Sequence, residues 1–126
     1  MTPEVSAAVE EIRQTVAGHR VEVEEESQGG AYVIVHDLEV GERFKPEKIW
    51  LGCLITFQYP IADVYPHFTH PGLTRADGAS LGEGFSTTSW RERPAIQVSR
   101  RSNRWNAATD TAAGKLLKVL EWMKKR

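Results

Sequence analysis

The chain has 126 residues, of which 40% are hydrophobic and 26% are charged, and its formal net charge is -1 at pH 7. This length suits a single domain spanning residues 1–126 with its own core, and this composition excludes a disordered chain and indicates no nucleic-acid partner. The single cysteine, Cys53, excludes an internal disulfide framework and a multi-cysteine zinc site.

The start of the chain lacks the features of a targeting segment. The first ten residues are acidic and contain no apolar region of the signal-peptide kind. No apolar run reaches the ~20 residues needed to span a membrane. Together with the lone cysteine, these observations predict a cytoplasmic protein without membrane contact.

The first third of the chain predicts a helix followed by a hairpin. Thr2 can cap a helix that ends at Gly18, with Pro3 in its first turn. Val21 and Val23 then alternate with glutamates, the segment 28–30 supplies turn residues, and a β-branched run follows over 31–36. The helical stripe consists of Val5, Ala8, Val9, Ile12 and Val16.

The rest of the chain predicts one long strand, a loop, a short strand and a helix. Residues 49–59 suit a buried strand, whereas prolines and glycines make 59–84 an irregular but ordered loop. Ala95–Arg101 can form a short strand, and Asn106 or Thr109 can cap the last helix. The predicted class is therefore α+β, with a helix packed on an antiparallel meander of at least three strands.

Three local motifs resemble the ubiquitin-conjugating enzyme family. Tyr59–Phe68, "YPIADVYPHF", is similar to the family's Tyr-Pro segment after the third strand, and His70-Pro71 matches the first two residues of its His-Pro-Asn motif. Ile96–Trp105, "IQVSRRSNRW", has the spacing of the active-site strand and the tryptophan that follows it. The resemblance implies a UBC-like fold, here ending after one C-terminal helix instead of continuing into two more.

Two departures from the family pattern bear on catalysis. The position of the catalytic cysteine is occupied by Gln97, whose amide cannot form a thioester. The motif asparagine, which supports the oxyanion in the family, is replaced by Gly72. Both losses are typical of the family's inactive variants, which bind ubiquitin or a partner enzyme, and they predict a pseudoenzyme.

A second alignment and other nucleophiles stay open. "GASLGE", residues 78–83, can be aligned with the active-site segment, which places Ser80 at the nucleophile. Gln97 is the preferred register because it alone keeps the short distance to the tryptophan. An active transferase could instead form an oxyester through Ser80 or Ser99, with His70 as base, or a thioester through Cys53.

Arginine and tryptophan side chains predict a protein interface. Both residue types are enriched at interaction hot spots, and the candidates are Trp90, Arg91, Arg93, Arg100 and Arg101. His67 and His70, with Asp63 and Asp77, have no scaffold typical of a metal site, so we expect them to serve loop packing and hydrogen bonding. No cofactor is predicted.

The resemblance implies a role in a bacterial ubiquitin-like modification system. The expected partners are a ubiquitin-like protein and either an activating enzyme or an active conjugating enzyme. We expect the sheet face and a long loop over 72–95 to bind them. A preformed surface of this kind costs less entropy on binding.

Overall fold

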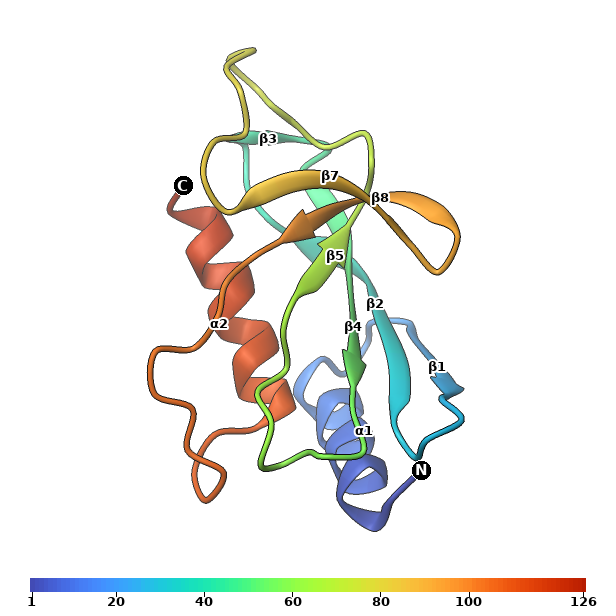
Figure 1. Ribbon diagram of the computed structural model, residues 1–126. Helices are drawn as coiled ribbons and strands as arrows, with labels where there is room; N and C mark the ends of the chain where they lie inside the picture. The colour runs from blue at the N-terminus through green and yellow to red at the C-terminus, as the bar shows by residue number, and fades with distance from the viewer.

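The computed structural model describes residues 1–126 and contains two helices and eight strands (Figure 1). In chain order these are α1 (Pro3–Thr15), β1 (Val21–Glu25), β2 (Ala31–Glu39), β3 (Phe44–Lys45), β4 (Lys48–Ile55), β5 (His67–Thr69), β6 (Thr74–Arg75), β7 (Phe85–Trp90), β8 (Arg93–Val98) and α2 (Ala112–Lys124). The predicted α+β class is confirmed. Neither helix is long and apolar enough to cross a membrane.

Six strands form one antiparallel sheet in the order β1-β2-β4-β5-β8-β7, and β3 pairs with β6 in a separate two-stranded ribbon. The predicted hairpin is confirmed, with Val23 of β1 opposite Val33 of β2. Because side chains alternate between the two faces of a strand, Val33 points into the core, and its neighbour Ile34 points to the other side. We call this second side the outer face.

Both helices contribute apolar side chains to one core against the inner face of the sheet. Thr2 caps α1 by accepting a hydrogen bond from the Val5 N–H (3.1 Å), as predicted. The core combines the apolar stripes of both helices with alternate residues of β2, β4 and β8. Its fully buried members include Val5, Ile12, Val33, Val35, Leu51, Ile55, Val98, Val119 and Met123. The outer face carries no helix.

The predicted loop over 72–95 is wrong, and so are the bounds of the neighbouring strands. Nearly half of the segment is regular, because β6, β7 and the start of β8 fall within it. The strand predicted for 49–59 ends at Ile55, after which the Tyr59 N–H donates to the Thr56 carbonyl (3.0 Å) and closes a turn. The short strand predicted over Ala95–Arg101 spans Arg93–Val98 instead.

The predicted caps of the last helix are also wrong. Thr111 caps α2 and accepts from the Gly114 N–H (3.0 Å). Asn106 instead closes a local turn, in which its side-chain oxygen accepts from the Ala108 N–H (2.9 Å). Short polar side chains readily form hydrogen bonds with nearby backbone groups. Because of this turn, the helix begins later in the chain than predicted.

Candidate functional site

Gln97 lies near the end of β8, paired with Phe68 of β5 and Ser86 of β7. Its neighbours along the strand, Ile96 and Val98, are buried in the core, so the Gln97 side chain lies on the outer face. Its amide nitrogen donates to Ser99 Oγ at 3.0 Å. The hydroxyl of Ser99 therefore has an amide as its hydrogen-bond partner, and an amide is not a general base.

The three residues aligned with the His-Pro-Asn motif, His70 to Gly72, form a turn. The Gly72 N–H donates to Nδ1 of His70 at 3.3 Å. A Cβ atom at position 72 would lie 3.0 Å from the His70 ring, so the imidazole occupies the space beside Gly72. His70 forms no hydrogen bond with a serine hydroxyl.

The remaining candidate nucleophiles also lack an activating partner. Cys53 is buried in β4, and burial raises the pKa of its thiol to about 12, which leaves no thiolate near neutral pH. Ser80 lies in an exposed loop, where the Asp77 side chain accepts from the Ala79 backbone N–H (2.9 Å). No hydrogen bond links Ser80 to a histidine or a carboxylate.

The predicted interface residues fall into two separate groups. Trp90, Arg91 and Arg93 surround the tip of the hairpin formed by β7 and β8, which crosses the sheet in Figure 1. Arg100 and Arg101 follow the other end of β8 and lie beside α2. Arg91 and Arg93 line one hollow, and Arg100 and Arg101 line another, so the two groups do not form one surface.

Trp90 is the centre of an aromatic cluster on the outer face. Its ring stacks on Phe68 with centroids 4.7 Å apart and planes 7° apart, and it also contacts Trp50 (6.2 Å) and Tyr32 (6.3 Å). The ring lies over Gly52, where a Cβ atom would come within 2.5 Å of it. The glycine therefore makes room for the indole.

The tip of this hairpin is held against β1 and β2. Arg91 and Glu92 both have positive φ values, 54° and 67°, as a two-residue type I′ turn requires, although these residue types rarely adopt them. The Arg91 guanidinium lies 4.2 Å from the Tyr32 ring centroid and pairs with Glu24. These contacts compensate for the unfavourable turn residues and fix Trp90 in place.

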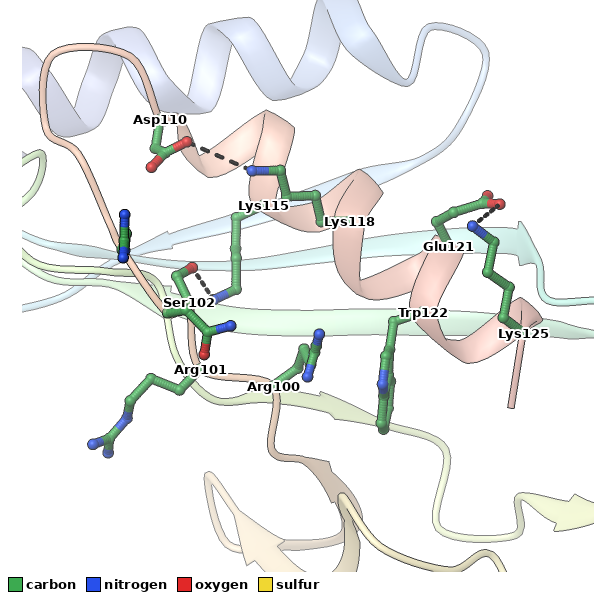
Figure 2. A pocket seen from close by; sticks show the side chains of 11 residues that line it. Arg100, Arg101, Ser102, Asp110, Lys115, Lys118, Glu121, Trp122 and Lys125 are labelled. Atoms are coloured by element: carbon green, nitrogen blue, oxygen red, sulfur yellow. Dashed lines mark hydrogen bonds and ion pairs between the residues drawn. The ribbon is translucent and has the colours of Figure 1, made fainter.

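Arg100 and Arg101 belong to a second hollow, the basic pocket, of about 540 Å³ between residues 100–104 and α2 (Figure 2). Six cationic side chains line it: Arg100, Arg101, Arg104, Lys115, Lys118 and Lys125. Only two carboxylates do so, Asp110 and Glu121, and Trp122 is its one hydrophobic side chain. Residues 91–126 hold ten Lys and Arg but three carboxylates, whereas residues 1–42 hold ten carboxylates and two arginines.

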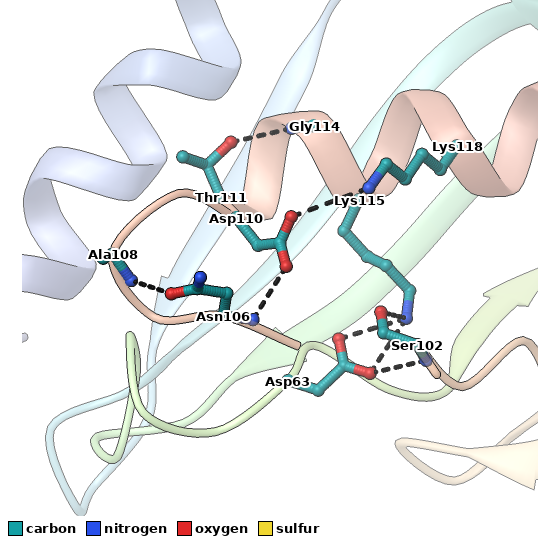
Figure 3. Close-up of polar contacts among 9 residues, drawn as sticks. All are labelled: Asp63, Ser102, Asn106, Ala108, Asp110, Thr111, Gly114, Lys115 and Lys118. Carbon is teal, nitrogen blue, oxygen red and sulfur yellow. Dashed lines mark hydrogen bonds and ion pairs between the residues drawn. The ribbon is translucent and has the colours of Figure 1, made fainter. Parts of the chain in front are cut away.

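A buried ion pair anchors the loop of the basic pocket (Figure 3). The Lys115 ammonium, 3% exposed, donates to both Asp63 carboxylate oxygens at 3.0 Å and to Ser102 Oγ at 2.7 Å. The Ser102 N–H also donates to Asp63 (2.9 Å). Burial alone would raise the pKa of Asp63, but the hydrogen bonds from Ser102 and Lys115 outweigh it and hold that pKa below its usual value.

Sequence reasoning missed the role of Lys115. Its position was a usable signal, because it shares the buried side of α2 with Ala112, Leu116 and Val119. A lysine on such a face requires a buried partner. Which carboxylate that is depends on the tertiary structure, since Asp63 is 52 residues away.

His67 was expected in a loop with hydrogen bonds, and this is wrong. It lies in β5, 1% exposed, and neither ring nitrogen has a hydrogen-bond partner. Burial and the nearby Lys115 charge outweigh the opposite effect of Asp63, and the pKa of His67 falls from its ordinary 6.5 to about 3. The ring is therefore neutral over most of the pH range.

This neutral histidine predicts acid sensitivity that one substitution removes. Between pH 6.5 and about 3 the unfolded chain protonates this residue and the folded chain does not. As the pH is lowered through this range, the free energy of unfolding should fall by up to about 1.4 kcal/mol per pH unit. In His67→Leu this part of the slope should disappear, and stability at pH 7 should match or exceed wild type by about 1 kcal/mol. Urea unfolding at a series of pH values measures this dependence, with His70→Gln as the control. The same dependence of stability on pH in wild type, His67→Leu and His70→Gln would contradict the expectation.

Comparison of the chain with protein-family models, curated proteins and solved structures finds no match in any of the three.

Proposed function

We propose that this chain is a non-catalytic protein of the ubiquitin-conjugating type, which binds a ubiquitin-like protein through the outer face of its sheet. The order of its elements supports this: a helix, an antiparallel meander of β1, β2, β4 and β5, and a final helix. The His70-Pro71 turn directly follows the last strand of that meander. The resemblance implies the same order.

The outer face is the observation that carries the proposal. An uncovered face of an antiparallel sheet is normally polar, but here Tyr32, Ile34, Trp50 and Trp90 present apolar surface that is only half-buried. The stacked rings and the hairpin turn hold this surface in one arrangement. A preordered aromatic surface of this kind is what a protein partner can bind at low entropic cost.

The residues at the aligned catalytic positions support a binding role instead of transfer. Gln97 has no thiol, Gly72 has no amide to place beside a reacting group, and Cys53 is enclosed in the core. An active conjugating enzyme of the same system is a second partner that this role allows. Transfer through Ser80 or Ser99 has no hydrogen-bonded base in its favour.

A binding titration with matched surface variants tests the proposal. The probe is the ubiquitin-like protein encoded beside this gene, and calorimetry measures its affinity for the chain. Ile34→Arg places a charge on the outer face and should weaken binding about tenfold or more. Leu117→Arg, at a position of α2 that is 45% exposed, introduces the same charge elsewhere and should bind as wild type does.

Three outcomes would contradict the proposal. The wild-type chain could bind neither the ubiquitin-like protein nor the active conjugating enzyme. The two arginine variants could lose affinity equally, which would mean that added charge and not the outer face is responsible. A genome neighbourhood without any ubiquitin-like protein or activating enzyme would favour a stand-alone scaffold.

A further inference from the structure

Three arginines of the basic pocket have no acceptor in the protein. Arg100, Arg101 and Arg104 take part in no hydrogen bond and no ion pair, although all other arginines of the last third except Arg93 do. Arg100 and Arg101 only lie against aromatic rings, those of Trp122 (5.7 Å) and Tyr65 (4.7 Å). Three guanidinium groups within five residues thus keep their donors free for a ligand.

The two exposed lysines on the opposite wall of the pocket are matched by two carboxylates, so the excess positive charge comes from the three arginines. Lys118 pairs with Asp110 at 3.6 Å and Lys125 pairs with Glu121 at 3.8 Å, and both lysines are more than 70% exposed. Exposed ion pairs at such distances contribute little to stability, so either lysine can turn to a ligand at low cost. Figure 2 shows Lys118 and Glu121 on α2, with Arg100 and Arg101 on the separate segment beside that helix. The net charge of the hollow is positive because Arg100, Arg101 and Arg104 have no carboxylate partner.

The arginine segment is fixed before any ligand arrives. Ser102 lies in its middle and is held by Asp63 and by the buried Lys115. Trp105 ends the segment with its indole N–H donating to the Pro60 carbonyl at 2.8 Å. Because the backbone between these anchors is ordered, binding pays little for ordering the loop.

We propose that the basic pocket binds the phosphate chain of a small polyphosphorylated ligand. Guanidinium groups bind phosphate oxygens in a bidentate manner, and a chain of phosphates presents several negative charges within the size of this hollow, about 540 Å³. An extended nucleic acid fits less well, because the formal net charge of the chain is -1 and residues 1–42 are predominantly acidic. The site is independent of the outer face.

Two sources of this phosphate chain are distinguishable. Inorganic tripolyphosphate carries the charge alone, whereas a nucleoside triphosphate adds a base that Trp122 could stack upon, since its indole lines the pocket. Equal affinities for tripolyphosphate and ATP would identify the chain of phosphates as the whole ligand. Tighter binding of ATP would identify a nucleotide.

Calorimetric titration of the full chain with tripolyphosphate, ATP and citrate tests the proposal. Measurements at about 150 mM salt keep nonspecific attraction low. We expect saturable binding of at least one phosphate compound at or below about 1 mM and weakening by about tenfold or more in the Arg100→Ala, Arg104→Ala double variant. Arg93→Ala removes a charge near the hairpin tip and should bind as wild type does. Urea unfolding confirms that the variants are folded.

The proposal is overturned by any of three results. Neither phosphate compound binds in a saturable manner; citrate, a tricarboxylate, binds as tightly as tripolyphosphate; or Arg93→Ala weakens binding as much as the double variant does. The last two results would indicate general attraction of anions. None of them bears on the ubiquitin-like protein, because the double variant leaves the outer face unchanged.

Discussion

Replacing Asp63 by asparagine is expected to lower the free energy of unfolding by about 3 kcal/mol. The substitution leaves the Lys115 ammonium, 3% exposed, without its carboxylate, and breaking a buried ion pair on one side typically costs about 3 to 5 kcal/mol. The Asp63 side chain is itself 17% exposed, which favours the lower end. Urea unfolding at pH 7 measures the loss.

Two further variants separate a buried charge from charge in general. Glu121→Gln breaks an exposed pair with Lys125 and should change stability by at most about 0.5 kcal/mol. Asp63→Leu combined with Lys115→Met removes both charges and should recover most of the loss. Equal effects of Asp63→Asn and Glu121→Gln would show that the ion pair is not buried in solution.

The same pair contributes to acid stability with a defined sign. The folded pKa of Asp63 lies below its ordinary 3.8, so its contribution is complete above that value and is lost as the pH falls through the folded value. The loss due to His67 starts at higher pH. His67→Leu should therefore leave an acid transition that is shifted down but still present.

Replacing Trp90 by alanine is expected to cost about 2 to 3 kcal/mol and to loosen the hairpin of β7 and β8. Large aromatic truncations in a core cost about 3 to 5 kcal/mol, and Trp90 is only half-buried. The variant removes the stack on Phe68 and the contacts with Trp50 and Tyr32. Urea unfolding gives the global effect, and amide hydrogen exchange across β7 gives the local one.

Two other substitutions check the cause. Trp90→Phe keeps a ring on Phe68 and should cost about 1 kcal/mol. Gly52→Val places atoms where the indole lies, since even a Cβ atom would come within 2.5 Å of it, and should loosen the hairpin in the same way. Unchanged exchange in β7 of Trp90→Ala would contradict this account of the outer face.

Regular patterns made part of the fold predictable. The structure contains the elements predicted by three regular patterns. These patterns are the helical stripe from Val5 to Val16, the alternation around Val23 and the apolar run containing Leu51. The hairpin of β7 and β8 was missed because its turn, Arg91 and Glu92, lacks the glycine or asparagine that normally marks a type I′ turn. Its energy comes instead from contacts with Tyr32 and Glu24, which lie far away in the sequence.

The candidate sites were predictable only as a set of residue types. Arginines and tryptophans indicated an interface, but the sequence does not tell that Arg91 turns toward β1 while Arg100 turns toward α2. That division depends on the bend of the hairpin across the sheet. Likewise, Gln97 and Gly72 could be recognised as departures from a motif, whereas the positions of their neighbours required the structure.

The most direct test of the proposed function is native mass spectrometry of the chain with the ubiquitin-like protein, the activating enzyme and ATP. The account predicts a complex of the chain with the ubiquitin-like protein that separates into unmodified components on denaturation. A covalent adduct that survives denaturation would contradict the non-catalytic role. If no complex forms at all, the proposed binding role is contradicted.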